Sequence, residues 1–393
     1  MTICRKFSNY LKSIQNLNKD ILMIYIAIFC VTTIFVYFSE FLFKNNQKSL
    51  SYIVVAFTII FISIFAGIRD TTVGTDVEYY VVKHFNWGKN FSGHPLDYLG
   101  FMYYDEEVDP LYSIIVFIGA NIFDNINFIL FVLSFIVNFF VYLAIANERG
   151  KISVSIGWMI YCLLFFNTSL NIVRQACAVS IVFYLSVLLT NKKLSLRKFI
   201  LLGISAVLLH RSCIIILCCL PILHFLSLTQ KRKYLLCISC VFVCSLPLGF
   251  EVLSSVVSSF SFLPVRYSLY FNSLNSEQSK LLLEFIICSL PTFVLTVVIF
   301  KKKYFESSIR FYYVLAIVSI SQFLSTNLII SRISYYLVIF FIISVPYSAQ
   351  LISSRSRGRL VYHLFIIIWF SIMWYINIIK FGYGETFPYR IAL

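Results

Sequence analysis

Several basic residues that could bind an anion interrupt or end long apolar runs. Arg174 stands at the start of one such run, His210-Arg211-Ser212 interrupts another, and Arg332 lies far from any other charge. Arg266 lies among tyrosines in a loop rich in Ser and Phe. A single arginine at such a position often anchors a helix at a membrane surface by extending its head group toward water. Several arginines with hardly any carboxylates nearby predict an anion site, because guanidinium forks suit phosphate oxygens.

The elements that must position these residues are membrane helices. Sixty per cent of the 393 residues are apolar and only 12% are charged. A bilayer core of about 30 Å needs about 20 apolar residues per helix. The sequence therefore predicts an all-α, polytopic membrane protein with about 12–13 helices. We expect spans near 21–43, 50–68, 111–123, 126–146, 152–170, 172–190, 199–210, 213–227, 235–250, 281–300, 309–330, 333–349 and 360–380.

The net charge of +15 indicates membrane topology rather than nucleic-acid binding, because the basic residues lie in short joints between apolar runs. Clusters at 192–198, 231–233, 301–303 and 355–359 are each separated by two spans, as expected for one cytoplasmic face. The joints between them then face the other side. These include Asn171–Arg174, His210–Arg211, the 251–280 loop, Ser325–Arg332 and the tail after Lys380.

The side of the 69–110 loop is left open by the sequence. This polar loop holds eight of the seventeen acidic residues. Strict alternation of spans puts it in the cytoplasm, with the basic residues of the 1–20 extension. The run 111–123 is short, however, and such lengths are often re-entrant or interfacial. If it does not span, the loop shares a compartment with His210 and Arg332, and Lys44 and Lys48 become the cytoplasmic charges.

Sparse motifs along the chain carry a family resemblance. The string 66–80, Ala-Gly-Ile-Arg-Asp-Thr-Thr-Val-Gly-Thr-Asp-Val-Glu-Tyr-Tyr, resembles the opening signature of the EpsG-like family, relatives of the Wzy-type O-antigen and exopolysaccharide polymerases. The likeness continues through roughly residues 50–390. Its further motifs are Asn171–Ala176, His210-x-Ser212, Arg332-Ile333-Ser334-Tyr335-Tyr336 and Phe387-Pro388-Tyr389. Arg211 departs from the pattern, where a small residue or proline is more usual, and so does the basic N-terminal extension.

The resemblance implies a GT-C-like membrane glycosyltransferase that joins oligosaccharide repeat units carried on undecaprenyl diphosphate. It implies the outer face of a bacterial inner membrane. It also implies a chain-length regulator and a flippase as partners, besides the bilayer and the lipid-linked glycan. Catalysis then requires arginines to neutralise the diphosphate leaving group and a base for the attacking hydroxyl. We expect Arg174 and Arg332, then Arg69 and Arg266, to bind the diphosphate, and either Asp76 or His210 to be the base.

Other interpretations of these residues remain open at this stage. Asp76 could pair with Arg69 and shape its loop, and His210 could cap a helical hairpin. Within the enzymes, an O-antigen ligase or another lipid-linked sugar transferase would use the same donor. A flippase or transporter would also gather arginines, and a scaffold would need none of them. No cofactor is predicted, and the acidic group 105–109 has no recognised metal-ligand spacing, so we interpret it as a solvated face.

The domain organisation follows from the same patterns. The sequence predicts a basic N-terminal extension over residues 1–20 and a single polytopic membrane domain over 21–393, with polar loops at 69–110 and 251–280. Aromatic residues near the acidic group could stack on sugar rings or form an interfacial belt. They are Trp87, Phe101, Tyr103, Tyr104 and Tyr112.

Overall fold

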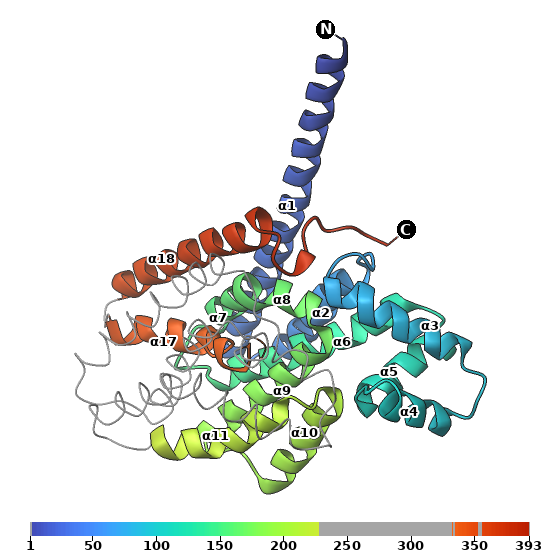
Figure 1. Cartoon of the computed structure of the whole chain (residues 1–393). Helices are drawn as coiled ribbons and strands as arrows, with labels where there is room; N and C mark the ends of the chain where they lie inside the picture. Colours follow the sequence, from blue (N-terminus) through green and yellow to red (C-terminus); the bar gives the residue numbers. More distant parts are fainter. Residues whose placement is uncertain (1, 228–331, 333–334, 353–355, 393) are drawn as a thin grey trace.

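The described part of the molecule is entirely helical. The computed structural model describes residues 2–227, 332, 335–352 and 356–392, and within them there are isolated backbone bridges but no strand (Figure 1). This confirms the predicted all-α membrane class. The expected spans near 235–250, 281–300 and 309–330 and the 251–280 loop lie outside the described residues. The total of about 12–13 helices therefore stays a prediction.

Six helical segments in the described ranges are long and apolar enough to cross a membrane. They match predicted spans to within a few residues. They are the Leu22–Lys44 part of α1 (Thr2–Lys44), α2 (Lys48–Gly67), α6 (Ile126–Asn147), the rod Val154–Asn171, α9 (Val173–Thr190), and α18 (Ser356–Trp374) continued by the π-helical turn η4 (Tyr375–Lys380). The rod consists of α7 (Val154–Tyr161), the π-helical turn η2 (Cys162–Phe166) and α8 (Asn167–Asn171). Residues 2–21 continue α1 as helix, away from the bundle (Figure 1).

One end of the bundle, which we call the basic end, is formed by the turns 45–47, 148–153 and 191–195. The Arg149 guanidinium lies 3.6 Å from the centroid of the Phe43 ring, which joins the first two turns. The Asn191 side chain donates to Glu148 at 2.6 Å and accepts from Lys151 at 2.8 Å, which joins the last two. Lys44, Lys48, Lys192 and Lys193 lie at this end too.

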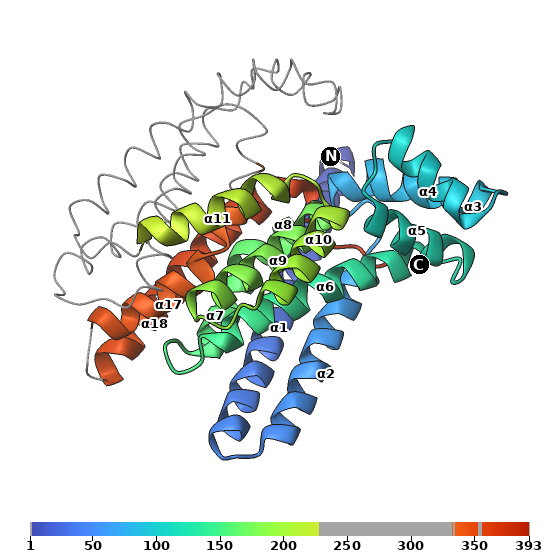
Figure 2. The ribbon, with the colours of Figure 1, turned by 90° about the horizontal axis from the view of Figure 1, so that it is seen from below.

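The opposite end, which we call the site end, holds everything between α2 and α6. The last turn of α2 contacts the start of α6, since a Cβ on Gly67 would lie 2.8 Å from that of Phe131. The intervening chain forms the π-helical turn η1 (Val77–Val81), α3 (Val82–Asn90), α4 (Pro95–Tyr104) and α5 (Pro110–Asn121). Figures 1 and 2 show α3, α4 and α5 grouped at one side of the molecule.

The predicted span at 111–123 is therefore corrected. Helix α5 has 12 residues, and both of its ends stay at the site end. Its last residue, Asn121, donates to the Gly88 carbonyl at 3.0 Å, and the preceding Asp109 contacts Arg211. Helix α10 (Leu196–Leu209) leads from the basic turn 191–195 to His210 at the site end, and α11 (Cys213–Ser227) follows it. The 69–110 segment consequently lies at the same end as His210 and Arg332.

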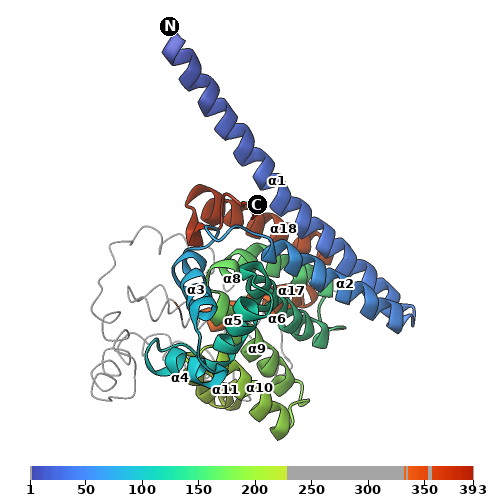
Figure 3. The same ribbon diagram turned by 90° about the vertical axis from the view of Figure 1, so that its right-hand side faces the viewer.

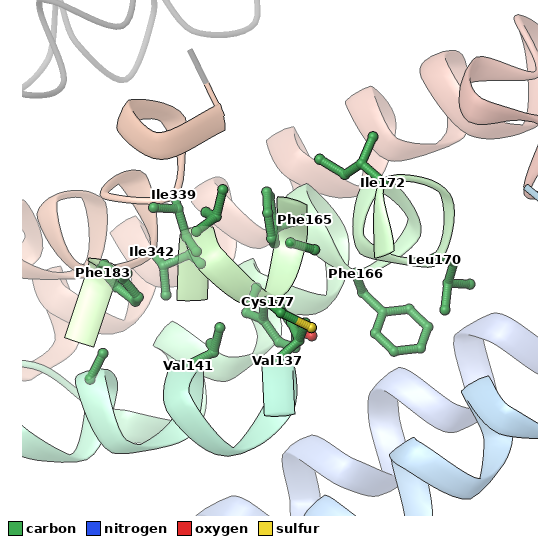
Figure 4. Packing of buried hydrophobic residues seen from close by; sticks show 14 of the residues in the cluster. Val137, Val141, Phe165, Phe166, Leu170, Ile172, Cys177, Phe183, Ile339 and Ile342 are labelled. Carbon is green, nitrogen blue, oxygen red and sulfur yellow. The ribbon is translucent and has the colours of Figure 1, made fainter. Parts of the chain in front are cut away.

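Helix α9 is the centre of the bundle and packs along α6 (Figure 4). Lipid tails are as apolar as the helices, so association in a bilayer depends on close packing rather than on the hydrophobic effect. The buried Ala176, Cys177, Ala178 and Ser180 give α9 a slender surface that lets neighbouring helices approach. Val137, Ile339 and Phe183 of α9 itself belong to the buried core at this helix. Helix α17 (Phe341–Ile352) covers the same core.

Buried hydrogen bonds connect the first helices to the rest. Asn138 of α6 donates to Ser63 of α2 at 3.1 Å and accepts from Tyr161 at 2.7 Å. Trp158 donates to Thr32 of α1 at 3.2 Å. Such bonds between membrane helices contribute about 0.6 kcal/mol on average. They fix the long α1–α2 hairpin, which Figure 3 shows lying along one side of the bundle, against α6 and the rod.

The two ends should differ in accessibility from outside the cell. Cysteines introduced by Tyr104→Cys, at a side chain 79% exposed on the site end, and by Lys193→Cys, on the basic end, test this. Because lysine-rich ends face the cytoplasm, we expect an impermeant maleimide to label the first variant in intact cells and the second only after lysis. The parent chain gives the background. Labelling of both variants from the same side would contradict the two-ended arrangement.

Candidate active site

A polar pocket opens at the site end, where four segments from distant parts of the chain meet. It is small, with only about 20 Å³ open to the centres of water molecules. The segment around η1 provides Asp76 and Tyr80, and the start of α9 provides Arg174 and Gln175. His210 ends α10, and Arg332 completes the wall. Four of the six site residues expected from the sequence thus line one pocket, whereas Arg266 lies outside the described residues.

Arg69 occupies a different place from the one expected. Its side chain is 1% exposed, and its guanidinium donates to three backbone carbonyls, those of Ala66, Val73 (3.4 Å) and Leu170 (2.8 Å). Burial lowers the pKa of Arg69 to about 10, so the group stays charged at neutral pH. Since its donors point at the backbone, we remove Arg69 from the proposed diphosphate ligands. It anchors the loop that carries Asp76.

A break between two helices receives that loop. Ile172, with φ −82° and ψ 50°, separates the rod from α9. The Asn171 side chain accepts the backbone N–H of Asp76 at 2.9 Å. Gly74 lies against the same break with φ +101°, and a Cβ there would lie 3.0 Å from the Leu170 carbonyl oxygen. The string 66–80 therefore works as a structural unit. Arg69 and Gly74 hold the loop against the break, and this contact places Asp76 in the pocket.

The end of the chain holds this loop from the other side. Backbone N–H groups of Asp70 and Gly74 donate to the carbonyls of Arg390 (2.8 Å) and Glu385 (3.0 Å). Tyr389 stacks on Phe65 with ring centroids 4.3 Å apart and donates to the Phe65 carbonyl. The Phe387-Pro388-Tyr389 motif is thus part of the support for the 69–76 loop rather than of the pocket lining.

The remaining motif residues join the walls of the pocket. The Ser212 and Tyr336 hydroxyls are 3.1 Å apart, which links the turn after His210 to the helix after Arg332. Tyr335 and Tyr383 are likewise joined through their hydroxyls at 3.1 Å. The His-x-Ser and Arg-Ile-Ser-Tyr-Tyr strings therefore place one residue each in the pocket, and the hydroxyls of Ser212, Tyr335 and Tyr336 fix its position.

Arg174 is held by aromatic rings instead of by a carboxylate. Its guanidinium lies 5.5 Å from the centroid of Tyr80 and 5.1 Å from that of Tyr112. Tyr112 is itself buried and bonded to His84 Nδ1 at 3.1 Å. Cation–π contacts stabilise a guanidinium without cancelling its charge. Across the described ranges Arg174 forms no ion pair, so its charge remains available to an anion in the pocket.

Asp76 lies between the two pocket arginines. One of its carboxylate oxygens is 3.9 Å from Arg332 Nη2, and the Arg332 carbonyl accepts from Gln175 at 2.6 Å. Burial raises the pKa of Asp76, and the charges of Arg332 and Arg174 oppose this shift. The ion pair expected as an alternative, between Asp76 and Arg69, does not form. Asp76 contacts Arg332 and lies within the electrostatic influence of Arg174, which suits a counter-ion for these arginines in the absence of substrate.

His210 is held neutral by its surroundings. Its side chain is 16% exposed, and burial together with the charges of Arg174, Arg332 and Arg211 lowers its pKa well below the usual value. Its Nδ1 is buried without a hydrogen-bond partner in the described structure. The nearest acidic atom is Asp109 Oδ2 at 3.8 Å. A neutral imidazole keeps one nitrogen lone pair that can accept a proton, and the three neighbouring arginines oppose the positive charge that results.

Asp109 is the pocket neighbour that the sequence reasoning misses. A solvated face is expected for the group 105–109, but Asp109 is only 4% exposed. Its pairing with Arg211 explains the burial, and that contact joins residues about a hundred positions apart. The local signal is the dipeptide Asp109-Pro110, since proline in the first turn of a helix marks its start. In the described ranges no three His, Cys, Asp or Glu side chains form a group that could hold a metal ion.

The aromatic residues near the acidic group divide into two sets. Tyr112 is fully buried beneath Arg174, so it cannot stack on a sugar. Tyr103 and Tyr104 are 44% and 79% exposed, with ring centroids 5.1 Å apart. The Lys83 ammonium lies over the Trp87 ring, 4.1 Å from its centroid, in a cation–π contact. The exposed pair is the part of this group that remains accessible to a ligand.

Comparison with known proteins agrees with the motifs. A family model described as the EpsG family matches residues 52–391, which include every described segment of the pocket. No curated protein and no solved structure matches the chain.

Because Gly74 packs closely against the break between the rod and α9, adding a methyl group there should lower the stability of the protein. A left-handed conformation costs a non-glycine residue about 1–2 kcal/mol, and Gly74→Ala adds a clash with the Leu170 carbonyl. Gly150→Ala is the matched control, because Gly150 has φ +94° but a Cβ added there would have nothing within 4 Å. We expect Gly74→Ala to lower the denaturation temperature of the purified protein more than Gly150→Ala does. Equal shifts would contradict the role of the close approach.

Proposed function

This chain belongs to the EpsG family of membrane proteins implicated in exopolysaccharide synthesis, and we propose that it is a glycosyltransferase. In this proposal it polymerises oligosaccharide repeat units carried on undecaprenyl diphosphate into O-antigen or exopolysaccharide. The site end then faces outward, and the reaction takes place at the outer face of a bacterial inner membrane. A chain-length regulator and a flippase are its expected partners.

One observation carries the proposal: Arg174 and Arg332 line the same pocket, and Arg174 reaches it without a carboxylate partner among the described residues. Arginines preorganised in a water-poor site stabilise negative charge more strongly than they would in water. A lipid diphosphate gains charge when its bond to the sugar breaks. The two guanidinium groups suit that leaving group, and Asp76 would yield its place between them when the diphosphate enters.

The proposed step is a displacement at the anomeric carbon of the donor glycan. A hydroxyl oxygen of the acceptor sugar forms the new glycosidic bond, and the bond from the anomeric carbon to the diphosphate oxygen breaks. The electron pair of that bond leaves with undecaprenyl diphosphate, whose charge Arg174 and Arg332 neutralise. The hydroxyl proton goes to a base on the protein.

We assign the base to His210. Its imidazole is neutral and lines the pocket beside both arginines proposed to bind the diphosphate. Asp76, the other candidate from the sequence, is drawn toward the arginines and serves better as their counter-ion. The two assignments differ in outcome. Under ours, His210→Gln removes acid–base catalysis, worth about 10²–10⁴-fold in rate, whereas Asp76→Asn mainly weakens the positioning of Arg332.

The first test is a gel of surface polysaccharide from a host that lacks this gene, beside the complemented strain. A ladder that collapses to a single repeat unit on its acceptor supports a polymerase, since transfer to the acceptor continues. Bare acceptor with lipid-linked polymer accumulating would instead indicate a ligase. An unchanged ladder would contradict both glycosyltransferase activities.

In the complemented strain, Arg174→Ala and Arg332→Ala should abolish polymer while the protein stays in the membrane at normal abundance. Removing one preorganised charge stabiliser typically costs about 10²–10³-fold in rate. Lys89→Ala is the matched control, because Lys89 lies at the same end but forms an exposed ion pair with Asp124. Full-length polymer from either arginine variant would remove that residue from the diphosphate site.

A further inference from the structure

A buried carboxylate stands directly behind the pocket. Asp109 precedes the first residue of α5 and is 4% exposed. Burying an ionised carboxylate is costly unless partners compensate for the lost water. Asp109 has such partners in two consecutive residues, His210 and Arg211, at the turn after α10.

The two oxygens of this carboxylate have different partners. Oδ1 accepts from Arg211 twice, from its backbone N–H at 3.3 Å and from its Nε–H at 3.0 Å. Arg211 is fixed in turn by the Glu107 carbonyl at 3.1 Å and by the Tyr103 ring at 5.6 Å. This leaves Oδ2 directed to His210, whose Nδ1 lies 3.8 Å away and has no other partner in the described residues.

From this geometry we propose that Asp109 is a positioning residue for His210, holding the proton of the neutral imidazole on Nδ1. The lone pair is then on Nε2, at the opposite edge of the ring. A separation of 3.8 Å is longer than a hydrogen bond, but catalytic hydrogen bonds are often long in ligand-free structures and shorten when substrate binds. Arg211 keeps Oδ1 occupied, so only Oδ2 can receive the Nδ1–H.

The consequence for the reaction rests on the function proposed above. As Nε2 takes the proton of the acceptor hydroxyl, the ring becomes an imidazolium next to Arg174, Arg211 and Arg332. Three positive neighbours oppose this change. The negative charge of Asp109 on the other edge of the ring favours it and keeps the ring from turning. No atom is lost from Asp109, and its role is orientation and electrostatics.

The proposal can be tested without activity, by the nitrogen NMR spectrum of the histidines in the purified full-length protein in lipid. The His210 signals are identified by their loss in His210→Gln. We expect the proton on Nδ1 in the unmodified protein. In Asp109→Asn the amide nitrogen facing the ring is a donor, so the proton should move to Nε2. A proton on Nε2 in the unmodified protein overturns the proposal, whether or not the variant folds.

Polymer synthesis gives the second readout. Asp109→Asn should lower the rate of repeat-unit polymerisation in cells at least about 10²-fold, at unchanged abundance, as expected when a base has the wrong tautomer. Asp105→Asn, an exposed carboxylate in the same acidic group, is the matched control and should match the parent. Parent-like polymer from Asp109→Asn would refute the positioning role. An unchanged ladder in the gene-deletion strain would refute only the proposed function, because the tautomer measurement stands alone.

Discussion

The buried guanidinium of Arg69 is the interaction on which the rest of the site depends. An irregular loop inside a membrane protein leaves backbone carbonyls without partners, and each costs free energy in a water-poor environment. Arg69 donates to carbonyls at the end of α2, in the loop itself and at the end of the rod. Arginine suits this task because it is a planar fork with five donors that stays charged. A single side chain thereby joins three backbone segments.

Two further contacts convert this anchor into a defined position for Asp76. The absence of a side chain on Gly74 lets the loop touch the Leu170 carbonyl, and Asn171 captures the Asp76 backbone. The C-terminal tail then closes over the loop through paired backbone bonds. The site is thus built at the break between the rod and α9. The last residues of the rod offer hydrogen-bond acceptors to the loop, and the first turn of α9 places Arg174 in the pocket.

The electrostatics of the pocket follow from how few carboxylates reach it. Arg174, Arg211 and Arg332 lie around His210, against the two carboxylates of Asp76 and Asp109. Each cation is held by a different means: Arg174 by aromatic rings, Arg211 by Asp109, and Arg332 in part by Asp76. Of these three, Arg174 is the one that forms no ion pair within the described ranges. The same cations keep His210 neutral, so the proposed anion-binding wall and the proposed proton acceptor share one set of residues.

The sequence by itself determined the membrane class, the bounds of the long apolar helices in the described ranges and four of the pocket residues, because apolar length and isolated charges are local properties of a chain. It also singled out the string 66–80 as a distinctive motif. Only the tertiary structure decided which end of the bundle holds that string, since a short helix such as α5 can cross or return and only its contacts with α3 and Arg211 distinguish the two. Only the tertiary structure, likewise, showed that Arg69 binds backbone carbonyls instead of lining the pocket, and that Asp109 lies beside His210. These outcomes depend on where carbonyls and cations distant in the sequence come to lie, and spacing along the chain does not encode that.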